Sequence, residues 1–172
     1  MSTQTTAAGF DVQKETGEER RPLVMQIIID RSLSKNTAWN RGTLIAQGAH
    51  AATAVLAQTW DEQDTREYVS PSNLGSMHKI VLLGPKTGTL ADLSAKLKEA
   101  AAAAASESTT NDKEGGEQDG SSRIAGAEDE GFPKHHLWIE QPEGIPTAIA
   151  LAPNRKPAAL TKVLNKCSLF RD

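Results

Sequence analysis

The sequence is poor in several features that would define a class of protein. Its 172 residues include a single cysteine, Cys167, so an internal disulfide is excluded. A catalytic cysteine needs a basic, well-placed neighbour, and Lys166 is weak support for one, so we interpret Cys167 as a packing residue. No apolar run approaches the roughly 18 residues of a membrane-spanning helix. The first twenty residues lack the pattern of a targeting signal, and we expect a soluble cytoplasmic protein without membrane contact.

Several catalytic signatures are also absent. The chain has no Gly-x-Ser-x-Gly element of serine hydrolases and no glycine-rich loop that cradles phosphates. The histidines do not fit a metal site, because the adjacent His135 and His136 point to opposite faces of a strand and no His/Cys pair has a zinc-like separation. We therefore expect neither a metal nor a cofactor.

Charge is distributed unevenly along the chain. The net charge is -3, yet residues outside 1–21 and 100–131 include 14 basic and 10 acidic side chains, which makes that part close to +4. This mild positive charge is compatible with a phosphate-bearing partner without requiring one. Residues 1–21 are polar and have no hydrophobic periodicity, so we predict that they form a disordered tail.

A second unusual stretch interrupts the domain that we predict at residues 22–172. Six consecutive alanines at 100–105 favour helix but bury little, and the polar and acidic tract that follows cannot offset the entropy of ordering it. We predict a disordered acidic insertion at about residues 104–131. A tolerated surface insertion and an acidic regulatory tether are both compatible with this composition.

The remaining segments alternate between strand-like and helix-like patterns. Residues 23–30 form an apolar run rich in β-branched side chains, which predicts a strand buried on both faces in the centre of a sheet. Further strands are predicted at residues 78–83, 135–140 and 145–151, the last two forming an antiparallel hairpin. Helices are predicted at residues 41–56, 89–97 and 156–166, with a short one between 60 and 75. This order predicts an α/β protein, a three-layer α/β/α sandwich around a four-stranded mixed sheet.

The predicted helix at residues 41–56 contains almost no bulky side chains, so other parts of the protein can approach its backbone closely. Gln47 and His50 lie one turn apart on one face, where both side chains reach the same small volume. This face is our first candidate site. Each residue also has a structural interpretation: Gln47 could cap a buried backbone group, and His50 could be a core histidine bonded to a backbone carbonyl.

Several segments occur in an order that is typical of one family. They are residues 25–30, 41–47 with 50–52, 79–82, the leucine-rich helix after residue 89, and residues 147–153. Together they resemble the type 2 peptidyl-tRNA hydrolases. Residues 46–54, 74–82 and 137–143 are most similar to a divergent branch, the peptidyl-tRNA hydrolase domain-containing proteins. The resemblance implies hydrolysis of the ester that joins a peptide to the terminal ribose of tRNA, which recycles the tRNA.

The resemblance also implies a set of site residues. In the family, a Lys-Gly-Lys element opens the central helix, an acidic residue ends the third strand and a threonine begins the fourth. An ester hydrolase without a metal must orient water, stabilise developing negative charge and bind the tRNA backbone. Arg41, Thr43, Glu140 and Thr147 hold these positions here; the helix face adds Gln47 and His50, and the basic residues of the folded part add Lys35 and Lys79. We expect catalytic roles for Arg41, His50, Glu140 and Thr147, and substrate binding by Lys35, Thr43, Gln47 and Lys79.

The chain departs from the family pattern at this site. Arg41 keeps a positive charge but cannot act as a base, and Thr43 stands where the family has its second lysine. Glu140 could instead be a solvated strand end, Thr147 a packing residue, and the lysines an ordinary charged surface. Hydrolysis of peptidyl-tRNA, hydrolysis of a related acyl substrate, and a catalytically inactive tRNA- or ribosome-associated binding module all remain compatible. The family tendency also makes a homodimer possible.

Overall fold

The computed structural model describes residues 21–110 and 131–171. The predicted disordered tail and most of the predicted insertion at about 104–131 lie outside these residues. In chain order the elements are β1 (Val24–Ile29), η1 (Leu33–Lys35), α1 (Arg41–Gln58), α2 (Gln63–Tyr68), η2 (Leu74–Ser76), β2 (His78–Leu83), α3 (Leu90–Thr110), β3 (His135–Glu140), β4 (Ile145–Leu151), α4 (Ala158–Leu164) and β5 (Ser168–Leu169). The alanine run belongs to α3, which continues to Thr110.

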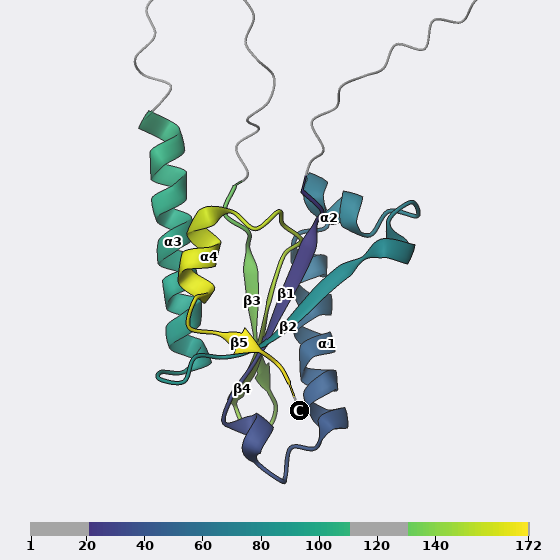
Figure 1. Ribbon diagram of the computed structural model, residues 1–172, viewed down its shortest axis with the longest axis vertical. Helices are drawn as coiled ribbons and strands as arrows, with labels where there is room; N and C mark the ends of the chain where they lie inside the picture. Colours follow the sequence, from purple (N-terminus) through teal and green to yellow (C-terminus); the bar gives the residue numbers. More distant parts are fainter. Residues whose placement is uncertain (1–20, 111–130, 172) are drawn as a thin grey trace, which may run out of the picture.

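The strands form one mixed sheet in the order β3-β4-β1-β2-β5 (Figure 1). β1 pairs in parallel with β2, and the other neighbours pair antiparallel. All six residues of β1 are buried, which confirms the predicted central strand, and the predicted β3–β4 hairpin is confirmed as well. The predicted number of four strands is wrong, because Ser168 and Leu169 pair with the end of β2. Two residues are too few to show an alternating pattern, so this strand depends on its partner.

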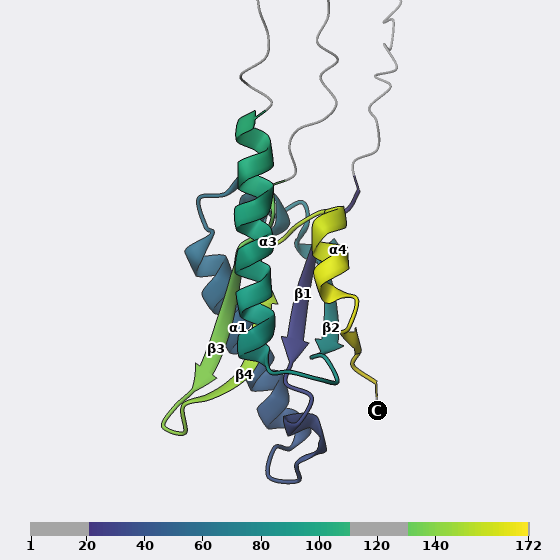
Figure 2. The ribbon, with the colours of Figure 1, turned by 90° about the vertical axis from the view of Figure 1, so that its left-hand side faces the viewer.

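Helices cover both faces of the sheet, which confirms the predicted three layers (Figures 1 and 2). On the face of α1, Met25 and Ile27 of β1 belong to one core cluster with Ala51 and Val55 of the helix. A Cβ atom at Gly48 would meet the Ile27 side chain at 3.3 Å, so α1 lies close to the sheet because its residues are small. On the opposite face, leucines of α3 and α4 pack on the central strands. They are Leu90, Leu93, Leu97 and Leu160, packed with Ile28, Ile149 and Leu151.

Side chains before the two long helices determine where these helices begin. Asn40 precedes α1, and its Oδ1 accepts a 2.9 Å hydrogen bond from the amide of Thr43. Before α3, the amide of Asp92 donates to the Thr89 hydroxyl at 3.1 Å, while the Asp92 carboxylate accepts from the Thr89 amide at 2.8 Å. This reciprocal arrangement confirms the predicted cap at Thr89 and holds the pKa of Asp92 below its ordinary value. No helix among the described residues is long and apolar enough to cross a membrane.

Candidate active site

Most of the candidate residues belong to three segments: the loop and first half of α1 that follow β1, the end of β3, and the start of β4. Figure 2 shows the start of α1 and the β3–β4 turn at the same end of the molecule. α1 packs against β4, β3 and β1. The backbone joins two of these segments directly, because the amide of Asp30 donates to the carbonyl of Thr147 at 2.9 Å. Segments that are more than a hundred residues apart in the chain therefore form one surface.

Glu140 is held in place by Trp138, which is itself stacked on His50. The indole Nε1 of Trp138 donates to Oε2 of Glu140 at 2.9 Å, and both side chains are half-buried. The same indole stacks on the imidazole of His50, with ring centroids 4.7 Å apart and an interplanar angle of 17°. His50 is exposed, so it is not the core histidine of the structural interpretation. A carboxylate that accepts from one fixed donor keeps further lone pairs for a water or a substrate hydroxyl.

Gln47 and Thr147 form a buried polar contact between α1 and the sheet. The Thr147 hydroxyl donates to Oε1 of Gln47 at 2.8 Å, and their exposed fractions are 0% and 2%. Thr147 has no partner in the β3–β4 pairing, because Trp138 pairs with Ala148 whereas Ile139 pairs with Pro146. This irregularity is a β-bulge, a feature that often lies beside active sites and redirects a side chain.

The first turn of α1 places Arg41 and Thr43 differently. Arg41 is exposed at the first helical position, where a positive charge is disfavoured by the helix dipole unless an anion or an acidic group is near. The amide and the hydroxyl of Thr43 both point to Oδ1 of Asn40, at 2.9 and 3.2 Å. Thr43 thus serves the helix cap, and the charge at this helix end comes from Arg41.

The two candidate lysines lie in different places. Lys35 is exposed in η1, between the end of β1 and the start of α1. Lys79 pairs in the sheet with Met25, and its Nζ lies 5.2 Å from the centroid of the Tyr68 ring. Asp30, just after β1, lies five positions beyond Met25, which is roughly 16 Å in an extended strand. The structure therefore does not bring Lys79 to the other candidate residues.

Trp138 and Asn40 are parts of the site that we did not single out from the sequence. The signal for Trp138 was available, because alternation along a strand puts residues 136, 138 and 140 on one face. The signal for Asn40 was also present, since asparagine is among the preferred residues before a helix. Neither pattern could show that the Trp138 ring would meet His50, because this contact joins two elements.

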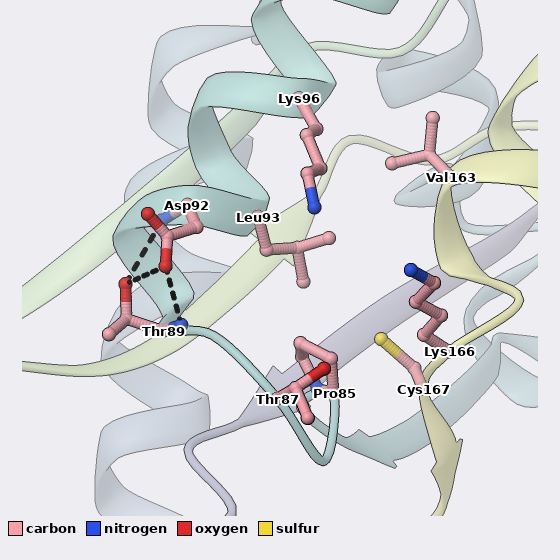
Figure 3. A pocket seen from close by; sticks show the side chains of 9 residues that line it. All are labelled: Pro85, Thr87, Thr89, Asp92, Leu93, Lys96, Val163, Lys166 and Cys167. Carbon is pink, nitrogen blue, oxygen red and sulfur yellow. Dashed lines mark hydrogen bonds between the residues drawn. The ribbon is translucent and has the colours of Figure 1, made fainter.

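Two other concave regions lie between α3 and α4, on the opposite face of the sheet. One is a cavity of about 20 Å³ beside Leu93 and Cys167, which has room for about one water molecule (Figure 3). Burial raises the pKa of the Cys167 thiol, so this cysteine is not an activated nucleophile. The other is an open groove of about 560 Å³ lined by Lys96, Lys162 and Lys166. Neither region includes Glu140 or Arg41.

Metal-binding side chains do not gather in the described part of the chain. Among residues 21–110 and 131–171, no group of three or more His, Cys, Asp or Glu side chains could hold a metal ion. His135 bonds to Ser94 of α3, whereas His136 lies near Trp138 on the other face of the sheet, as predicted for adjacent residues of a strand.

Known proteins resemble this chain over most of its length. Residues 23–114 match the family described as "Peptidyl-tRNA hydrolase PTH2". The human and mouse proteins named "Putative peptidyl-tRNA hydrolase PTRHD1" are each 31% identical over 157 residues, which cover 91% of this chain and 88% of the relative. A match of that length includes Glu140 and Thr147, which the family match to residue 114 does not reach.

Proposed function

The chain belongs to the peptidyl-tRNA hydrolase family PTH2, and from this premise we propose that it hydrolyses the ester between a peptide and the terminal ribose of tRNA, recycling the tRNA. The observation that carries the proposal is the fixed carboxylate of Glu140, which accepts a 2.9 Å hydrogen bond from Trp138, the residue that stacks on His50 of α1. A carboxylate with one oxygen held and the other able to accept from water can orient that water for attack on an ester carbonyl.

Glu140 is the general base or water-orienting group in this proposal. Arg41 cannot take a proton from water because a guanidinium stays charged, and among the described residues at this end Glu140 is the carboxylate that Trp138 orients. The stack of Trp138 on His50 limits the rotation of the indole, which in turn keeps the carboxylate in one position. His50 therefore contributes to catalysis through the position of Glu140.

Arg41 stabilises the negative charge that develops on the carbonyl oxygen of the ester. Its guanidinium offers donors in a planar fork, and the partial positive charge of the α1 N-terminus adds to it. The buried Gln47–Thr147 contact holds the bulge of β4 against α1, so it supports the position of the strand that follows Glu140. Lys35, exposed between β1 and α1, is placed to contact a phosphate of the substrate. Lys79 has no role in this proposal.

The test is hydrolysis of an N-blocked aminoacyl-tRNA by the purified full chain, compared with Glu140→Gln. We expect the variant to lose about 10²–10⁴-fold in turnover, the usual contribution of a general base. The matched control is Glu143→Gln, because Glu143 is an exposed carboxylate of the same turn. Turnover in Glu140→Gln within twofold of the unchanged protein, or an equal loss in Glu143→Gln, would refute the role of Glu140.

One observation favours a second function, a tRNA- or ribosome-associated binding module without turnover. The family's second lysine is replaced by Thr43, whose amide and hydroxyl both contact Asn40. If this loss ended catalysis, the unchanged protein would bind tRNA with a strong dependence on salt and would release no peptide. The same assay therefore separates the two functions. Cytoplasmic location and a homodimer stay predictions.

A further inference from the structure

Two histidine rings lie against Trp138, the residue that holds Glu140, in a chain that has few aromatic rings. The whole sequence contains 3 Trp, 3 Phe, 1 Tyr and 4 His. His50 of α1 stacks on Trp138 of β3 with 4.7 Å between centroids, and His136 of the same strand lies 6.2 Å from Trp138 with its ring tilted by 45°. We call His50, Trp138 and His136 the aromatic row. Two of its rings belong to β3, at one edge of the sheet, and the third belongs to α1.

The outer side of the aromatic row is open. His50 is exposed although one face of its ring is covered by Trp138, so the other face reaches solvent. One turn before and one turn after His50, α1 presents Ala46 and Ala54, whose side chains are too short to cover the imidazole. A ring that served only to pack the core would be covered on both faces. The small residues of α1 instead leave room for a flat group against His50.

We propose that the aromatic row binds an unpaired base at the 3′ end of tRNA, with the open face of His50 as the stacking surface. The proposal rests on the proposed function and names the part of the substrate that this surface takes. Proteins bind single-stranded RNA ends by stacking the bases on aromatic side chains, histidine included, and stacking tolerates different bases. The ester is attached to the terminal ribose, so the base beside it must lie close to Glu140.

The position of the row fits this requirement. Trp138 contacts both His50 and Glu140, so only two rings separate the open face of His50 from the carboxylate. A base stacked there would lie two ring layers from Trp138, and the ribose, the ester and the attacking water would span the remaining distance to Glu140. Neutral ring stacking also differs measurably from phosphate binding, because only the loss of a phosphate contact reduces the dependence of affinity on salt.

The experiment measures binding of uncharged RNA, so it does not depend on hydrolysis. A short RNA hairpin with a single-stranded 3′ CCA end is compared with the same hairpin lacking the base of its last nucleotide, using the full chain. We expect the complete end to bind about 5- to 150-fold more tightly, which corresponds to one stacked base. His50→Ala should abolish this difference and leave the salt dependence unchanged, whereas His50→Phe should restore it.

The matched control is His78→Ala, an exposed histidine at the start of β2, which should keep the discrimination. Equal binding of the two hairpins by the unchanged protein, including no binding of either, would overturn the proposal. Discrimination that persists in His50→Ala would overturn it as well. Loss of discrimination in His50→Phe would show that the imidazole acts through its nitrogens, which also overturns stacking.

The two proposals fail in different ways. Glu140→Gln should keep base discrimination while it loses turnover, because the row does not need the negative charge. A protein that discriminates between the hairpins but hydrolyses no N-blocked aminoacyl-tRNA refutes the hydrolase and leaves the stacking site standing. A protein that hydrolyses the substrate without discriminating between the hairpins refutes the stacking site and leaves the hydrolase standing.

Discussion

The two faces of the sheet use polar side chains in different ways. On the α3 face, Ser94 is 5% exposed and its hydroxyl lies 2.8 Å from Nε2 of the half-buried His135, so each polar group has the other as its partner. On the α1 face, Trp138 also orients a polar group, Glu140, but the stacked ring of His50 remains exposed. His135 is hydrogen-bonded to Ser94 and His50 is stacked on Trp138, and of these two histidines only His50 on the α1 face is exposed.

The adjacent residues His135 and His136 show how sharp this difference is. They differ by one position on β3, yet His135 contacts α3 and His136 lies in the aromatic row. Burial, with the positive charges of Lys98 and His136, lowers the pKa of His135. A serine beside a histidine resembles a nucleophile and its base, but neither described cavity is lined by Ser94 or His135. The pair therefore belongs to the packing of the α3 face.

The largest expected contrast between the faces concerns turnover. Arg41→Ala should lower turnover by about 10²–10³-fold, the usual cost of removing one donor to a developing oxyanion. Lys96→Ala on the α3 face removes an equal charge from a lysine-lined groove and should change turnover by less than about twofold, since it lies far from the ester. Steady-state hydrolysis of N-blocked aminoacyl-tRNA measures both. Equal effects of the two substitutions would remove the functional distinction between the faces.

A smaller contrast concerns the free energy of unfolding. Thr147→Val removes the hydroxyl that donates to Gln47 and leaves a buried amide oxygen without its donor, which should cost about 1–3 kcal/mol. Thr147→Ser keeps the donor and is the matched control. Urea unfolding of the three proteins gives the comparison. If valine and serine destabilise equally, the hydrogen bond contributes nothing and Thr147 is a packing residue.

The smallest effect is a pH dependence confined to the α3 face. Because burial lowers the pKa of His135 below its ordinary value of 6.5, the unfolded chain binds more protons than the folded one between the two values. Stability should therefore fall as the pH drops below about 6.5 and level off below the lowered pKa. Urea midpoints at several pH values measure this, and His135→Gln should flatten the dependence. If the urea midpoints of His135→Gln depend on pH as those of the unchanged protein do, the effect belongs to another group. His78→Gln replaces an exposed histidine and is the control.

Much of the fold could be predicted because local patterns specify it. The strands at 78–83, 135–140 and 145–151 were predicted with the bounds that the structure has, since apolar runs end there at turn residues. The last helix is shorter than predicted, from Ala158 to Leu164, because Pro157 precedes its first turn. Of the candidate site residues, Lys79 is the one that the structure places elsewhere, since a basic residue in the sequence does not specify which surface it will reach.

The sequence by itself determined that β1 is central, that α1 is built of small residues and that Glu140 ends a strand, because each depends on composition and periodicity within one segment. The direction of the Thr147 side chain was decided by the tertiary structure. Strict alternation would turn it toward the α3 face with Ile149 and Leu151, yet the bulge opposite Trp138 turns its hydroxyl to Gln47 of α1. A bulge arises from the pairing of two strands, so no pattern within one strand can reveal it.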